Sequence, residues 1–333
     1  MSFNILIIGQ RGRLTHEAAL FAATLRHNAP GWSGRLLVGE PQPGPRWPDD
    51  PRIPSGPQRA LLEELGAEIM PFETRHFGSY YPHGNKIEAL AAMPPGPFLF
   101  MDTDTVITAD LSELQIDFAR PAASLKREGT WPTPELYGPG FNEIWGDLHV
   151  RRGARLADTI DPEEPDEHWR RYLYFNAGWF FGDDPQAFHR AFLDAALMIR
   201  DDPPESLVCQ ELDPWLDQAA LPLAIHELGG GRPGSRPQDK GGIADGLLDG
   251  SHSFHYRFLP LMYATAPDHV IAATEAATAP NRVKKVLKEY EPFRRFLYQP
   301  KGAKARAMFD RGDLPRKEQA IRNRLKREGL WLR

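Results

Sequence analysis

The chain has 333 residues, of which 41% are hydrophobic and 11% aromatic, with a formal net charge of −5 and one cysteine, Cys209. This composition provides ample apolar surface for a folded core and excludes global disorder. No apolar run reaches the roughly 18 residues of a membrane span, the N-terminus lacks a signal-peptide pattern, and a single cysteine excludes an internal disulfide. These features predict a cytoplasmic protein.

The first 71 residues predict an alternation of strands and helices. Apolar runs indicate buried strands and helical patterns fill the intervals between them, in the order 4–9, 15–27, 35–39, 58–65 and 67–71. Thr15 is the expected cap of the first helix, and Gln10 lies in the turn before it. Such alternation is typical of a parallel sheet with right-handed crossovers.

A helix over residues 85–93 is predicted next, with Asn85 as its cap and Pro94-Pro95 as its end. Lys86 falls in the first turn, where a cation opposes the helix dipole. Two interpretations stay open. Lys86 is either an ordinary solvent-facing lysine or a phosphate-binding lysine beside free backbone N–H groups.

The apolar run over residues 98–101 predicts a buried strand that leads directly into Asp102 and Asp104. Ligands of open α/β sheets bind beyond the carboxyl ends of such strands. Two hard anionic oxygens at this place suit Mg²⁺ or Mn²⁺ shared with substrate phosphates. The alternative is a strand that ends in a polar turn capped by one aspartate.

The middle of the chain is less regular. Residues 120–172 are rich in Pro, Gly and Trp and predict a functional loop, and residues 172–181 form a strand-like run around Asn176-Ala177-Gly178. A helix is predicted over residues 186–200, and an apolar segment follows at 210–225. Residues 229–250 are a glycine-rich loop that suits either a lid or plain disorder, and a short polar run follows at 251–256.

Residues 281–333 form a basic tail with 17 Lys or Arg against 6 Asp or Glu, and two helices are expected near 282–290 and 315–329. An acidic body with a basic tail suggests contact with an anionic lipid surface, a nucleic acid or the body itself; the alternative is a solvated helical arm. Nucleic acid is not expected as a partner, because the basic charge does not form a face with aromatic residues. Peripheral contact with the inner face of a membrane remains an expectation.

Taken in order, these landmarks resemble the glycosyltransferases of family 8 and their relatives with the nucleotide-sugar transferase fold called GT-A. The resemblance covers about residues 3–260 and is carried by Lys86, 98–104, 175–181, 217–221 and His255-Tyr256. It implies an α/β, Rossmann-like fold with a mostly parallel central sheet flanked by helices. Residues 1–280 would be the nucleotide-sugar-binding catalytic domain, and residues 281–333 a helical C-terminal extension.

The resemblance further implies a hexosyltransferase-like enzyme that depends on Mn²⁺ or Mg²⁺. It would move a sugar from a nucleotide-diphospho-sugar, a UDP-sugar, to a glycan, lipid or protein acceptor, with retention of the anomeric configuration. The implied donor-binding residues are Lys86, Gln10, Asn176, Asp102 and Asp104. The implied metal ligands are Asp102, Asp104 and His255, with His252 as a rival to His255. The residues that would lie beside the reacting carbon are Asp217 and Gln218.

The chain departs from the family after His255. Family members commonly continue with a Gly and a Lys-Pro-Trp stretch that touches the phosphates, whereas this chain has Tyr256-Arg257-Phe258. Arg257 is the candidate replacement for the missing cation, and the departure leaves both the closure around the donor and the choice of His255 open.

Two alternatives compete. Residues 102–106 also come close to the motif of haloacid-dehalogenase-type phosphatases, in which Asp102 would attack phosphorus, Asp104 would act as acid and base, Lys126 would steady the phosphate and Asp183-Asp184 would hold magnesium. Against this, the motif follows three predicted strands instead of lying on the first. The other alternative is a non-catalytic nucleotide-sugar-binding relative, which the intact acidic pair and Lys86 disfavour.

Overall fold

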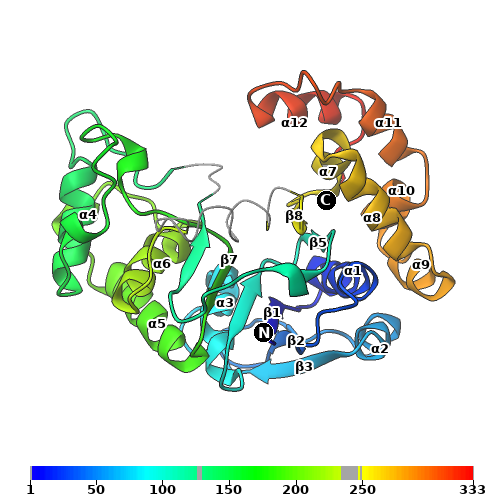
Figure 1. Ribbon diagram of the computed structural model, residues 1–333, viewed down its shortest axis with the longest axis horizontal. Coiled ribbons are helices and arrows are strands. Elements are labelled where there is room, and N and C mark those ends of the chain that lie inside the picture. The colour runs from blue at the N-terminus through cyan, green and yellow to red at the C-terminus, as the bar shows by residue number, and fades with distance from the viewer. Residues whose placement is uncertain (1, 126–129, 234–246, 248–249, 333) are drawn as a thin grey trace.

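The computed structural model describes residues 2–125, 130–233, 247 and 250–332 (Figure 1). A six-stranded sheet has the order β3-β2-β1-β4-β7-β6, and a two-stranded sheet pairs β5 with β8. The strands are β1 Asn4–Ile8, β2 Leu36–Pro41, β3 Ala67–Phe72, β4 Phe98–Met101, β5 Thr105–Ile107, β6 Ala122–Ser124, β7 Asn176–Gly182 and β8 Ser253–His255. The first four strands of the large sheet in this order are parallel, and β7 is antiparallel to both of its neighbours.

Helices cover both faces of the large sheet and continue to the C-terminus. They are α1 Arg13–Asn28, α2 Pro57–Glu64, α3 Asn85–Glu88, α4 Phe141–Arg151, α5 Pro185–Asp201, α6 Leu216–Glu227, α7 Leu259–Thr265, α8 Asp268–Thr278, α9 Asn281–Leu287, α10 Glu291–Leu297, α11 Lys301–Ala307 and α12 Glu318–Arg327. None of the helices in the described ranges combines the length and the apolar character needed to cross a bilayer.

The central strands are apolar on both faces, because each face is covered by helices. Alternate residues of β4 enter different clusters: Phe98 and Phe100 pack in the cluster that includes α5 and α6, and Leu99 and Met101 in the cluster that includes α1. Phe100 stacks on Phe180 of the antiparallel neighbour β7, with ring centroids 4.7 Å apart. This packing holds β4 against β7, and hence helps to position the residues that follow β4.

A third hydrophobic cluster joins the C-terminal helices to α1. Val283, Phe293 and Ile321 from the segment after residue 280 share this cluster with Met262 of α7 and Leu20 of α1. Figure 1 shows α7 to α12 gathered beside α1 and the β5–β8 sheet. The described residues 281–332 are therefore a packed helical layer, and the alternative of a solvated arm does not hold.

The expected fold class, a mostly parallel α/β sheet flanked by helices with a helical C-terminal extension, is confirmed. The strand predicted from the apolar run before Asp102 is confirmed as β4, which ends at Met101, and a break separates it from β5, which belongs to the second sheet. Thr103 causes the break. Its hydroxyl donates to the Ile8 carbonyl at 2.6 Å and accepts from the Ile8 N–H at 3.2 Å, so the chain turns around the end of β1.

Several local predictions also need correction. Helix α3 spans only Asn85–Glu88 and continues as a 3-10 turn, and the Asn85 side chain donates to Gln10 Oε1 at 3.1 Å instead of capping the helix. Helix α1 begins at Arg13, and Thr15 Oγ1 donates to the Gln10 carbonyl. The predicted loop over residues 120–172 contains β6 and α4. In the glycine-rich loop, residues 234–246 and 248–249 lie outside the described residues.

Candidate active site

A cleft of about 530 Å³ lies where β4 ends and where β7 and α6 begin. Seven of the predicted site residues line it: Lys86, Asp102, Asp104, Asn176, Asp217, Gln218 and His255. They come from α3, the turn after β4, the first residue of β7, the first turn of α6 and the end of β8. The sheet topology therefore brings together residues that lie far apart in the sequence.

Asp102, Asp104 and His255 can act as a ligand set for a metal ion. One carboxylate oxygen from each aspartate and one imidazole nitrogen lie within 4.8 Å of one another. His255 Nε2 is 3.0 Å from Asp104 Oδ1 and 3.8 Å from Asp102 Oδ2. Burial alone would raise the pKa of Asp104, but His255 and Arg13 outweigh it and hold the pKa at about 2. Asp104 is thus a carboxylate at neutral pH.

Backbone contacts hold this ligand set in place. The Asp102 N–H donates to the Gly178 carbonyl of β7 at 2.8 Å, and the Tyr256 N–H donates to the Asp104 carbonyl at 2.9 Å. Thr105 of β5 pairs with His255 of β8. This pairing brings the imidazole beside the turn of residues 102–104 between β4 and β5, which we call the acidic turn. A Cβ on Gly178 would lie 2.9 Å from His255 Nδ1, so only glycine leaves room for the imidazole at this position.

Lys86 connects the acidic turn to α6. Its Nζ lies 3.0 Å from Asp102 Oδ1, 3.1 Å from Asp217 Oδ2 and 3.1 Å from the Ala177 carbonyl oxygen. The side chain is only 7% exposed. Burial lowers its pKa, but the Asp102 and Asp217 carboxylates more than offset this and raise the pKa above its ordinary value. An ammonium group has three N–H donors, and Lys86 directs all three toward protein acceptors.

The pair Asp217-Gln218 is held from two sides. Tyr81 Oη lies 2.9 Å from Asp217 Oδ1, and the Asp217 N–H donates to the same tyrosine oxygen. The Gln218 N–H donates to Asp217 Oδ1, and Tyr174 Oη donates to Gln218 Oε1 at 2.7 Å. With Asp217 3% exposed and Gln218 on the wall of the cleft, the buried residue supports the accessible one.

Of the other expected donor-binding residues, Asn176 lies in the cleft and Gln10 does not line it. Asn176 Oδ1 accepts from the Gly178 N–H at 2.8 Å, which turns the side chain back over its own strand. Gln10 uses its carbonyl and its Oε1 to hold Thr15 and Asn85, so it fastens the turn after β1 to the start of α3.

The sequence did not single out Arg13 and Glu17, which lie directly beneath the acidic turn. Arg13 Nη1 is 2.9 Å from Glu17 Oε1 and 3.5 Å from Asp104 Oδ2. Glu17 is 3% exposed; burial, and next the charge of Asp104, raise its pKa well above the ordinary value. An i, i+4 Arg–Glu pair at the start of a helix is indistinguishable in sequence from a surface pair.

The structure separates the residues that the alternatives need. His252 Nε2 lies 3.9 Å from Glu113 Oε2, and His252 is not part of the ligand set, which contains His255. Gly182 pairs with Phe98, so Asp183 and Asp184 follow β7 at the opposite end of β4 from Asp102. They cannot share one magnesium ion with Asp102, which contradicts the phosphatase alternative. Lys126 lies outside the described residues.

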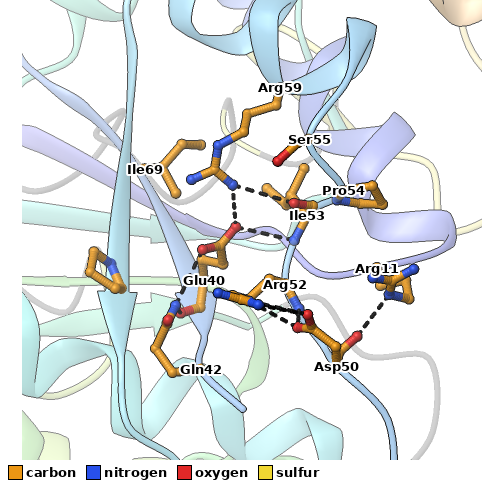
Figure 2. A pocket seen from close by; sticks show the side chains of 11 residues that line it. Arg11, Glu40, Gln42, Asp50, Arg52, Ile53, Pro54, Ser55, Arg59 and Ile69 are labelled. Carbon is orange, nitrogen blue, oxygen red and sulfur yellow. Dashed lines mark hydrogen bonds and ion pairs between the residues drawn. The ribbon is translucent and has the colours of Figure 1, made fainter.

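A second cavity of about 650 Å³ lies over the ends of β2 and β3 (Figure 2). Two of its three arginines are paired with its two carboxylates. Arg59 Nη1 is 2.6 Å from the buried Glu40 Oε1, which also accepts the Ile53 N–H, and Arg52 contacts Asp50 at 2.8 Å. Figure 2 shows these contacts. They hold the loop after β2 in place beside this strand.

Comparison with known proteins identifies the family of this chain. Residues 5–229 match the Rhodobacterales glycosyltransferase domain, and no curated protein matches. A crystal structure of an active-site mutant of LgtC is similar at 13% sequence identity and a TM-score of 0.38, covering 69% of this chain and 71% of that one. The family match covers more than half of the chain and includes Lys86, Asp102, Asp104, Asn176, Asp217 and Gln218. The protein therefore belongs to the Rhodobacterales glycosyltransferase domain family and is a sugar-transferring enzyme.

Proposed function

We propose that the protein is a divalent-metal-dependent glycosyltransferase that takes its sugar from a nucleotide-diphospho-sugar, with a UDP-sugar as the first candidate donor. The acceptor would be a glycan, a lipid or a protein, and the transferred sugar would keep its anomeric configuration. The observation that carries this proposal is the bridge formed by Lys86, which ties Asp102 of the acidic turn to Asp217 beside Gln218 within one cleft.

The donor atoms fit the proposed metal. Two carboxylates and one imidazole within 4.8 Å suit Mn²⁺ well and Mg²⁺ acceptably, since both cations prefer oxygen ligands and Mn²⁺ also accepts nitrogen. Asp102, Asp104 and His255 would hold the ion. When bound, it would neutralise the negative charge that grows on a departing diphosphate.

The remaining residues divide into binding and support. Gln218 would contact the donor sugar, because its amide lies on the cleft wall and Tyr174 fixes its orientation. In a retaining transfer this amide oxygen would steady the positive charge that develops on the sugar. Asp217 would act as a positioning residue for Gln218 and Lys86, since it is buried and bonded to both. Asn176 would complete the donor side of the cleft.

The test is donor hydrolysis by the purified protein. Incubation with a panel of nucleotide sugars and Mn²⁺ should release free sugar slowly with one donor, and Asp102→Asn, Asp104→Asn and Gln218→Ala should abolish or strongly reduce the release. Asp313→Asn, an exposed aspartate outside the cleft, is the control and should hydrolyse donor as the wild type does. The configuration of the released sugar, followed by NMR, tests retention. Turnover of phosphomonoesters without turnover of any nucleotide sugar would overturn the proposal.

A peripheral contact with an anionic membrane is a second proposal. It is supported by exposed cations in α12 and in the two residues before it. Arg316, Lys317, Arg324 and Arg327 are exposed, and each cation near an anionic surface contributes about 1 kcal/mol to binding. Deleting residues 281–333 would expose the third hydrophobic cluster, so substitution is the sounder test. Changing these four residues to Gln should reduce co-sedimentation with phosphatidylserine vesicles; unchanged co-sedimentation would refute the contact.

A further inference from the structure

One part of the cleft wall takes no part in the candidate metal site. It consists of His83, Pro214, Trp215 and Gln218, which line the same cleft as the acidic turn. His83 lies in the 3-10 turn Pro82–Gly84 directly before α3, and Trp215 is the residue directly before α6. We call these four residues the Trp215 wall. None of them carries a carboxylate, ammonium or guanidinium group.

Tyr81 holds the two halves of the Trp215 wall together. This tyrosine is buried, and its Oη lies 3.0 Å from the Pro214 carbonyl oxygen and 2.9 Å from Asp217 Oδ1. Its ring contacts the His83 imidazole, with ring centroids 5.5 Å apart. One side chain therefore fixes the positions of His83 and of the segment that contains Trp215.

The polar groups of the Trp215 wall are left free by the rest of the described chain. No described residue accepts the Nε1–H of Trp215 or bonds to the imidazole nitrogens of His83. Gln218 uses its Oε1 to accept from Tyr174, and its Nε2 has no partner within the same residue ranges. The indole of Trp215 packs on the hydrophobic cluster that includes α5 and α6 and is only partly buried. The wall therefore combines an accessible aromatic ring with neutral groups that can bond to a ligand.

We propose that the acceptor is a saccharide and that the Trp215 wall is its binding site. This inference rests on the proposed function. A sugar ring has an apolar C–H face and a rim of neutral hydroxyl groups, so the indole can pack against the face while the groups around it bond to the rim. The imidazole of His83 can both donate to and accept from a hydroxyl group, and the Gln218 Nε2 can donate to one.

A lipid chain or an anionic group fits the same wall poorly. An acyl chain would cover the indole N–H, the imidazole and the amide without bonding to them, and a buried donor without a partner is unfavourable. An anionic group finds no cation among the four residues, and the ammonium of Lys86 beside them is already bonded to Asp102 and Asp217. A neutral polyhydroxyl compound can satisfy these groups.

Saturation-transfer difference NMR of the full-length protein with a panel of methyl glycosides of hexoses and N-acetylhexosamines, in the presence of Mg²⁺, tests the inference. At least one glycoside should bind, with the strongest transfer to its ring C–H protons, and Trp215→Ala should weaken this binding about tenfold or more. Trp215→Phe, which keeps a ring but not the N–H, should fall between the two. His83→Ala should also weaken binding, whereas His27→Ala, at an exposed position of α1 outside the cleft, should bind as the wild type does.

Donor hydrolysis separates the possible failures, and thermal midpoints show whether the variants are folded. Trp215→Phe carries the comparison if Trp215→Ala does not fold. If the wild type hydrolyses no nucleotide sugar in the presence of Mn²⁺, the proposed function fails and the inference with it. If it hydrolyses a donor but binds no glycoside, or if both Trp215 variants bind the glycoside as tightly as the wild type, the inference alone is overturned. Transfer only to a lipid or peptide hydroxyl would overturn it as well.

Discussion

Lys86 and Asp217 form a buried ion pair of 3.1 Å in which the lysine is 7% and the aspartate 3% exposed. A buried pair of this kind is a net stabilising element only while both members are present, because the loss of one leaves the other as an uncompensated charge. Lys86 also contacts Asp102 at 3.0 Å. Its removal would therefore leave two carboxylates facing each other across the cleft.

Lys86→Met should lower the free energy of unfolding by roughly 3–5 kcal/mol, as measured by urea denaturation. Lys285→Met, at an exposed position of α9, is the matched control and should change it little. Adding Asp217→Asn to Lys86→Met should recover part of the loss, since one of the stranded charges is then removed. A single variant as stable as the wild type would show that the ion pair does not support the cleft.

The two candidate histidines give a sharp test of the metal site. Mn²⁺ should raise the thermal midpoint of the wild type, because a ligand that binds only the folded state stabilises it by about 2.7 kcal/mol at 100 times its dissociation constant, and a chelator should reverse the rise. His255→Ala should lose most of this increase, whereas His252→Ala should keep it, since only His255 lies with the two aspartates. An equal response of both variants would contradict the assigned ligand set.

The sequence was sufficient to predict the parts of this site that directly follow or begin a strand or helix. An apolar run ending in two aspartates predicted the acidic turn, and the family resemblance implied Asp217-Gln218, which the structure places at the start of α6. It could not predict that Lys86 is bound by acceptors from three other segments, because each contact depends on where those segments pack. The hydroxyl of Thr103, which ends β4 by bonding to Ile8, is equally invisible in a one-dimensional pattern.

Arg322 was beyond prediction for a related reason. Its place on the cleft wall depends on the path of α7 to α12, which is set by the third hydrophobic cluster and not by local propensity. From sequence alone Arg322 is one of many basic residues on a tail, and only tertiary packing distinguishes it from Arg324 on the same helix.

Glu17 should make the stability of the protein depend on pH. Burial and Asp104 raise its pKa in the folded state above the ordinary value of 4.5. Below that value both states are protonated and Glu17 carries no penalty. As pH rises above it, the unfolded state loses its proton first, so the folded state becomes relatively less stable.

Glu17→Gln keeps an oxygen acceptor for Arg13 and removes this penalty. The variant should therefore gain stability over the wild type as pH rises from about 4 to 8, by on the order of 1 kcal/mol in urea denaturation. Glu68→Gln provides a control of opposite sign. A hydrogen bond from Arg35 lowers the pKa of Glu68, so this variant should lose stability relative to the wild type over the same range. A pH-independent difference for Glu17→Gln would show that Glu17 ionises normally.

Arg257 has a backbone conformation that an arginine rarely adopts, with φ at 55°. A left-handed residue other than glycine costs about 1–2 kcal/mol, and such strain persists at functional sites where the side chain is required. Arg257→Gly and Arg257→Ala both remove the guanidinium from the cleft wall, but only glycine also relieves the strain. The two variants therefore separate the role of the side chain from that of the backbone.

The free energy of unfolding of Arg257→Gly should be about 1 kcal/mol higher than that of Arg257→Ala. Both should show the same rise in KM for the sugar donor, because both lack the candidate replacement for the family's phosphate-contacting cation. Donor hydrolysis and urea denaturation on the same preparations measure the two effects. If Arg257→Gly kept the wild-type KM, the left-handed turn itself would be what the cleft requires, and the arginine at this position would have no part in holding the donor.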